Sequence, residues 1–181
     1  MKISIIYSSV TGNTEKLARG IRAIFSHNTH ICSIEQAPSS PLADLYLLGF
    51  WVRRGAPDNR MAQFMRTLQG QQVAFFGTLG AYPDSPHARK VIEAANELLT
   101  GNTVLGSFLC QGKIHASLTK TLQTDGALRM SHPMTPERIA RHEEAAKHPD
   151  EEDIRQAQEY FQRLAEGAKK TTIAQKERVK N

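Results

Sequence analysis

A hydroxyl-rich loop follows the first apolar run of the sequence and has the composition of an anion-binding site. After Ile3–Tyr7 the chain reads Ser8-Ser9-Val10-Thr11-Gly12-Asn13-Thr14 and then enters an amphipathic stretch over residues 14–25. Hydroxyls, main-chain N–H groups and the positive end of a helix dipole together can bind a phosphate. The loop contains no Lys or Arg, which suits a phosphate monoester held by hydrogen bonds. The same residues are also compatible with a plain Ser/Thr helix cap.

Two further loops each combine an aromatic residue with glycines. One follows the apolar run Leu45–Phe50 and begins Trp51-Val52-Arg53-Arg54-Gly55, and the other follows Val73–Phe76 and reads Gly77-Thr78-Leu79-Gly80-Ala81-Tyr82. Aromatic rings can lie on the faces of a planar ligand, while main-chain amides bind its polar edge. Core packing is the alternative for Trp51, the only tryptophan. Its Gly- and Arg-containing surroundings favour a loop position.

These loops are positioned by apolar runs that alternate with amphipathic stretches. The strands are predicted over Ile3–Tyr7, His30–Ile34, Leu45–Phe50, Val73–Phe76 and Val104–Cys110. Helices are predicted over residues 14–25 and 60–68, from Ser85-Pro86 onward, and from Asp150 through Leu164. Five strands separated by helices predict a doubly wound three-layer α/β/α sandwich with a parallel sheet of order 2-1-3-4-5. Ligands bind at the carboxyl ends of such strands, where the three loops meet.

The first loop in this position resembles the phosphate loop of flavodoxins, matched as Ser9-Val10-Thr11-Gly12-Asn13-Thr14. The resemblance covers the first strand through the fifth and resumes at the last helix. It implies a flavodoxin-like fold with FMN as the cofactor, bound by three loops. The implied FMN-binding residues are Ser8, Ser9, Val10, Thr11, Gly12, Asn13, Thr14, Phe50, Trp51, Val52, Arg53, Gly55, Thr78, Leu79, Gly80 and Tyr82.

The resemblance leaves two functions open. One is an electron carrier that passes single electrons between a reductase and an acceptor protein, with no catalytic residue of its own. The other is an FMN-dependent NAD(P)H:quinone-type reductase. Short loops around Trp51 and Tyr82 imply an exposed flavin edge and favour the carrier. Typical flavodoxins are acidic, whereas Arg53 and Arg54 here imply a redox partner with an acidic docking face.

Other nucleotide and phosphate motifs are missing. A response-regulator receiver needs carboxylates where this chain has Tyr7-Ser8 and Gly49-Phe50, and neither cysteine is followed by Arg at the phosphatase spacing. Gly112-Lys113 is followed by Ile114, so there is no Walker loop, and no Gly-x-Gly-x-x-Gly fingerprint occurs. These alternatives are therefore excluded.

The net charge of +5 is concentrated in residues 166–181, where five basic residues face two acidic ones. We divide the chain into a flavodoxin-like domain over 1–165, with an irregular insertion at 113–149, and a basic C-terminal tail over 166–181. A basic tail without aromatic residues is typical of a solvated helix end, so nucleic-acid binding is not expected.

The spacing of the cysteines and histidines does not predict a metal centre. Cys32 and Cys110 have no ligand spacing, and Cys110 is predicted to be an inert buried thiol. His115, His132, His142 and His148 fit no ligand cluster and are expected to be exposed. No apolar run reaches the ~20 residues of a membrane span, and the first residues read as a strand. We expect a cytoplasmic protein, either a monomer or a weak dimer.

Overall fold

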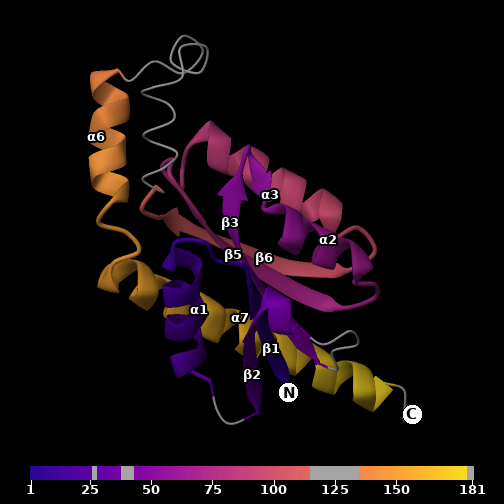
Figure 1. The fold of residues 1–181 in the computed structure, drawn as a ribbon. Helices are drawn as coiled ribbons and strands as arrows, with labels where there is room; N and C mark the ends of the chain where they lie inside the picture. The colour runs from indigo at the N-terminus through magenta and orange to yellow at the C-terminus, as the bar shows by residue number, and fades with distance from the viewer. Residues whose placement is uncertain (26–27, 38–42, 115–134, 179–181) are drawn as a thin grey trace.

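The computed structural model describes residues 1–25, 28–37, 43–114 and 135–178, with side chains described as far as residue 170. Its centre is a parallel sheet of order β2-β1-β3-β5-β6 (Figure 1). The strands are β1 (Ile3–Tyr7), β2 (Thr29–Ser33), β3 (Leu45–Arg53), β5 (Gln72–Leu79) and β6 (Thr103–Gln111). This is the predicted five-stranded order, so the doubly wound fold class is confirmed.

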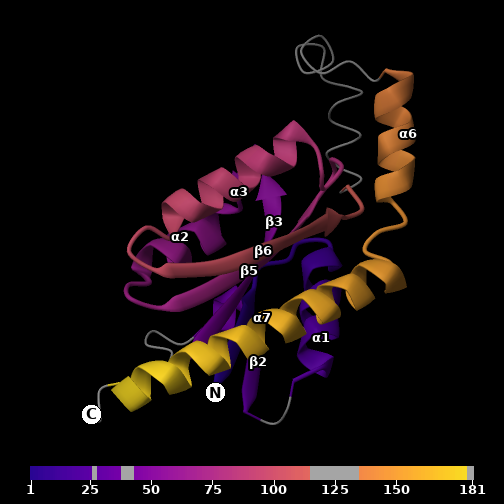
Figure 2. The same ribbon diagram turned by 180° about the vertical axis from the view of Figure 1, so that it is seen from behind.

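Helices cover both faces of the sheet, as Figures 1 and 2 show. One layer contains α1 (Asn13–Ala23) and α7 (Glu151–Arg178), and the other contains α2 (Asn59–Thr67) and α3 (Pro86–Leu98). A short 3-10 helix, η1 (Ile34–Gln36), follows β2. The alternation of strand residues separates two apolar clusters, which pack against these two helix layers. The central strands β1, β3 and β5 are therefore buried on both faces, as their nearly continuous apolar runs require, whereas β2 and β6 at the edges are only partly buried.

Local signals explain where the helices begin. Ser85 accepts a hydrogen bond from the Ala88 N–H, and Pro86 occupies the first turn of α3 as predicted. Asp58 caps α2 by accepting from the N–H groups of Arg60 and Met61. The predicted loop over Pro38–Pro41 and the short helix near Ala116–Leu122 lie outside the described residues.

The first aromatic loop is a β-hairpin rather than an irregular loop. Strand β3 continues through Trp51 to Arg53 and pairs antiparallel with β4 (Ala56–Pro57). Arg54 and Gly55 have φ angles of 53° and 82°. Positive φ at both central residues is the geometry of a type I′ turn, whose twist matches that of the paired strands. Trp51 is thus carried by a strand, which fixes its position more firmly than a free loop would.

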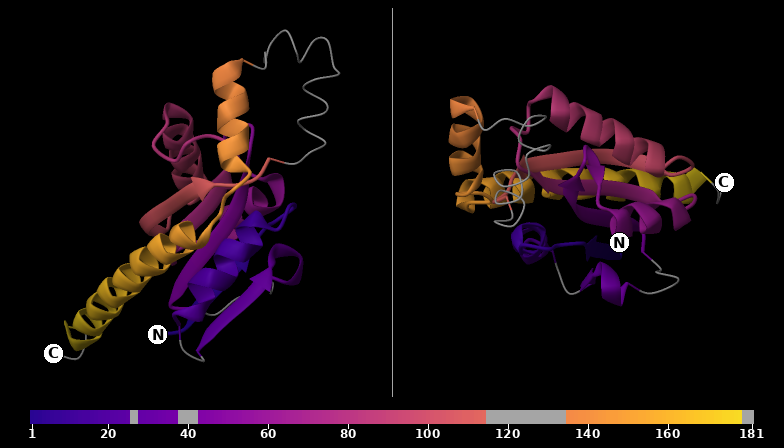
Figure 3. Two further views of the ribbon diagram at one scale, coloured as in Figure 1. Left: turned by 90° about the vertical axis from the view of Figure 1, so that its left-hand side faces the viewer. Right: turned by 45° about the horizontal axis from the view of Figure 1, so that its top comes forward.

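The insertion contains a helix that the sequence analysis did not predict, α6 (Pro136–Ala145). Thr135 caps it by accepting from the Arg138 N–H. It stands beyond the tip of β6, away from the two helix layers (Figure 3). The last helix, α7, continues without a break from the predicted domain into the basic tail as far as Arg178. Cys110 is buried, and burial followed by the charges of Asp153 and Asp150 raises the pKa of its thiol well above the usual value.

Candidate functional site

A cavity of about 880 Å³ opens at the carboxyl ends of the strands. Its walls come from the β1–α1 loop, the β3–β4 hairpin, the ends of β5 and β6, and α6. Elements far apart in the sequence therefore meet at one site, where the doubly wound topology places ligands. The volume lies within the range of about 300–1,000 Å³ that is typical of ligand pockets.

The inner wall is the loop that precedes α1. Gly12 is the N-cap of α1 in a left-handed conformation with φ of 86°, and a Cβ built there would meet nothing within 4 Å. Among the described residues, no side chain caps the first turn, so the main-chain N–H groups at this helix end remain available. The Ser9 Oγ atom is buried and has no hydrogen-bond partner in the same part of the chain. A phosphate would satisfy both kinds of donor.

The other polar side chains of this loop already have partners. The Ser8 hydroxyl donates to Asp58 Oδ1 at 3.0 Å, and the Thr14 and Thr78 hydroxyls share a buried hydrogen bond of 2.9 Å. Asn13 donates through Nδ2 to the carbonyl of Lys113. These three side chains hold the loop against α2, β5 and the end of β6. The side chains left for a ligand are those of Ser9 and Thr11.

The three aromatic residues assigned to the flavin differ in their burial and in whether they line the cavity. Trp51 is half-buried and lines the cavity, and its carbonyl accepts from the Asp58 N–H at 3.1 Å. The Phe50 side chain is fully buried and packs against Phe75. It points to the face of the sheet opposite Trp51, because neighbouring strand residues point to opposite faces. Tyr82 is 45% exposed and is not one of the cavity-lining residues.

The remaining predicted residues lie on the cavity wall. The set comprises Val10, Thr11, Asn13, Val52, Arg53, Gly55, Thr78, Leu79 and Gly80. Thr78 and Leu79 belong to β5, which is longer than predicted, and Thr78 pairs in register with Trp51. The structure thus brings the three predicted loops together, although several of their residues are on strands.

The outer wall is α6, whose residues the sequence analysis did not assign to the site. Arg138, Arg141 and His142 line the cavity. Their Arg Nε and His Nδ1 atoms are buried and have no hydrogen-bond partner among the described residues. Burial, and then the charges of Arg138 and Arg141, lower the pKa of His142. The i, i+3, i+4 spacing after Thr135-Pro136 was a sequence signal that could have identified this face.

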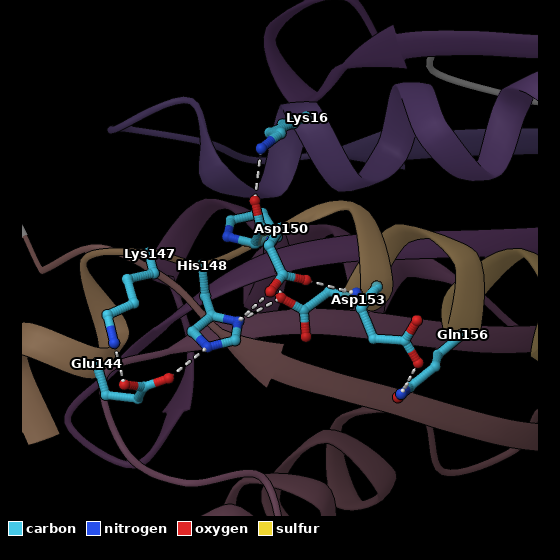
Figure 4. A network of polar contacts seen from close by, with 9 residues as sticks. Lys16, Glu144, Lys147, His148, Asp150, Asp153 and Gln156 are labelled. Carbon is cyan, nitrogen blue, oxygen red and sulfur yellow. Dashed lines mark hydrogen bonds and ion pairs between the residues drawn. The ribbon is translucent and has the colours of Figure 1, made fainter.

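A polar network at the start of α7 connects α6 to the inner wall (Figure 4). His148 pairs with Asp153 and Glu144, its carbonyl accepts from the Lys113 N–H, and the Lys16 ammonium donates to the Pro149 carbonyl. His148 is therefore half-buried and paired rather than exposed, and His142 is half-buried as well, which corrects the expectation for both residues. The predicted His115 and His132 lie outside the described residues.

Comparisons with known proteins identify the family. Residues 4–162 match the flavodoxin domain family. The flavodoxin-like domain-containing protein BilS of Clostridioides difficile (strain CD3) is 31% identical over 162 residues, which cover 87% of this chain and 92% of that protein. BilS of Clostridium symbiosum (strain WAL-14163) is 25% identical, with 89% and 94% covered.

Solved structures show the same fold at low identity. A flavodoxin of Streptococcus pneumonia TIGR4 matches with a TM-score of 0.60 and 14% identity, and it covers 92% of this chain and 99% of its own. Oxidised flavodoxin 2 of Bacillus cereus matches with a TM-score of 0.58, 18% identity and the same coverage.

The chain therefore belongs to the flavodoxin domain family, which confirms the resemblance found in the phosphate loop. Family membership and the fit of the inner wall to a phosphate together support FMN as the cofactor. Within the described residues, no helix combines the length and the apolarity needed to cross a bilayer.

Proposed function

We propose that this chain is an FMN-binding electron carrier that passes single electrons between redox partner proteins in the cytoplasm. The observation that carries the proposal is the buried, unpartnered Ser9 hydroxyl beside the uncapped start of α1, in the loop whose residues Val10 and Thr11 line the same cavity as Trp51. Both cysteines are free and buried, which suits a reducing compartment.

The residues of the inner wall have defined tasks in this function. The Ser9 and Thr11 hydroxyls and the first N–H groups of α1 would hold the phosphate, while Trp51 on the hairpin would contact the ring. FMN, when bound, supplies one-electron and hydride chemistry, and the protein supplies binding, orientation and electrostatics. Arg53 and Arg54 are exposed at the hairpin tip and give the docking face a positive charge. An acidic partner surface would complement it.

A second function is favoured by one specific observation. Helix α6 adds an outer wall to the cavity, so the site has more enclosure than the short loops alone provide. An enclosed site suits an FMN-dependent NAD(P)H:quinone-type reductase, in which a small acceptor binds beside the flavin.

One experiment tests both functions. The absorption spectrum of the purified protein reports bound flavin, and NADPH oxidation is then measured with and without an added flavodoxin reductase. The carrier accepts electrons only when the reductase is present. Rapid NADPH oxidation without it would favour the second function, and a protein that binds no FMN would refute both.

A further inference from the structure

The cavity carries more positive charge than one FMN phosphate can offset. Five formally charged cations line it: Arg53, Arg54, Lys113, Arg138 and Arg141. Among the described residues, no Asp or Glu lines it. A phosphate monoester brings about two negative charges at neutral pH, so most of this positive charge would remain after FMN binding.

Three of the basic side chains lie together on α6, and none of them forms an ion pair with an acidic side chain among the described residues. The two arginines are three residues apart, with His142 beside Arg141, so all three share one helix face. In the described part of the chain, neither arginine forms an ion pair, and their Nε atoms are buried without partners. Mutual repulsion also depresses the pKa of Arg138, after burial as the larger cause. An anion at this face would relieve the repulsion and complete the hydrogen bonds.

Another part of the cavity wall is apolar. Val10, Trp51, Leu79 and Ile114 line the same cavity as the α6 cations. A ligand that fills it must therefore combine an apolar body with an anionic group. The geometry points to a second ligand site, in which Arg138, Arg141 and His142 bind the carboxylate of an organic anion whose apolar part lies against Ile114, the member of these four that is not assigned to FMN.

A small molecule fits this site better than the surface of a protein. The unpartnered nitrogens are withdrawn from solvent and line a cavity, so a flat protein face would not reach them. Arginine forks suit a carboxylate because each can donate two parallel hydrogen bonds. The inference extends the proposed function by adding a ligand beside FMN. Binding of the anion by α6 does not depend on FMN, whereas a role of the anion in electron transfer rests on the proposed function.

The test is calorimetric titration of the FMN-loaded protein with naphthoate and with its neutral counterpart, naphthamide, at fixed ionic strength. We expect naphthoate to bind at least about tenfold more tightly, because only the charged ligand forms charge-assisted hydrogen bonds with the arginines. The double variant Arg138→Gln/Arg141→Gln should lose this preference. The variant Arg138→Lys/Arg141→Lys, which keeps the charge, should retain part of it.

The matched control removes two exposed cations from α7, as Arg163→Gln/Lys169→Gln, and should bind naphthoate like the parent. Equal affinity for naphthoate and naphthamide would overturn the inference, as would an equal loss in the control. So would competition between FMN and naphthoate combined with loss of FMN binding in the Gln variant, because the arginines would then hold the FMN phosphate. Charge-dependent naphthoate binding by a chain that binds no FMN would refute the proposed function and leave this inference intact.

Discussion

The inner and outer walls of the cavity offer different groups to an anion. The loop before α1 has no basic residue and offers hydroxyls and main-chain N–H groups, while α6 offers two arginines and a histidine. The inner wall is held by the Ser8–Asp58 and Thr14–Thr78 hydrogen bonds, whereas the cations of α6 have no such partners in the described part of the chain. A site of fixed dipoles and a site of unpaired charges thus share one cavity. The first suits a bound cofactor and the second an exchangeable anion.

The largest effect should follow from weakening the inner wall. Thr11→Val and Ser9→Ala each remove a hydroxyl donor from a doubly charged phosphate, so FMN affinity should fall by about tenfold to a hundredfold, or about 1.5–3 kcal/mol. Titration with FMN measures this loss. Riboflavin, which lacks the phosphate, should bind each variant as it binds the parent.

The matched control is Thr103→Val, at the opposite end of the sheet, where the side chain is exposed. It should bind FMN normally. Unchanged FMN affinity in Thr11→Val and Ser9→Ala would show that the phosphate lies elsewhere, with the cations of α6 as the first alternative.

A smaller effect, on the free energy of unfolding, is expected from replacing His148 in the polar network that connects α6 to the inner wall. Burial alone would lower the pKa of His148, but its hydrogen bond with Asp153 and the nearby carboxylates outweigh burial, and the pKa lies above the ordinary value. The protonated form therefore stabilises the fold. This stabilisation is complete below the unfolded pKa of about 6.5 and is lost as the pH rises through the raised folded pKa.

His148→Gln should lower the free energy of unfolding at pH 6 by about 1–3 kcal/mol, because a charged hydrogen bond is removed. It should also flatten the decline in stability as the pH rises above that value, measured by urea unfolding. His30→Gln, at an exposed position on β2, is the control. An identical pH profile in His148→Gln and the parent would show that the network does not depend on the imidazolium.

The two walls also differ in how far the sequence predicts them. The loop before α1 and the start of α3 at Ser85-Pro86 follow from local patterns, since each signal lies within a few adjacent residues. The strand order follows from the alternation of apolar runs and amphipathic stretches along the chain. Helix α6 carries only Ile139 as a large apolar residue, so its apolar periodicity is too weak to reveal it, and the Thr135-Pro136 start with the spacing of its basic residues is the one signal that it offers.

Tertiary contacts decided the remaining details of the site. Ser8 and Thr14 have the same chemistry as Ser9 and Thr11, and only the positions of Asp58 and Thr78 in the fold occupy their hydroxyls. The opposite directions of the Phe50 and Trp51 side chains follow from the extension of β3 beyond Phe50, because side chains alternate between the two faces along a strand. No local pattern contains this information.

The smallest effect concerns the two hairpin arginines. Arg53 and Arg54 are exposed, so solvent screens their influence on reduced FMN. Replacing both by Glu should lower the potential for the second electron by roughly tens of millivolts. It should also weaken the salt dependence of electron transfer to an acidic partner. Potentiometric titration and stopped-flow kinetics at two salt concentrations measure these changes. An unchanged potential with FMN still bound would show that both side chains point away from the ring.

The central claim is that FMN binds with its phosphate at the inner wall and its ring beside Trp51. Trp51 is the only tryptophan, so its emission reports ring contact directly. The decisive measurement is a titration of the FMN-free protein with FMN and, separately, with riboflavin while this emission is recorded. The account predicts that FMN quenches the emission and binds at least about tenfold more tightly than riboflavin. Unquenched emission at saturation, or equal affinity for the two flavins, would contradict it.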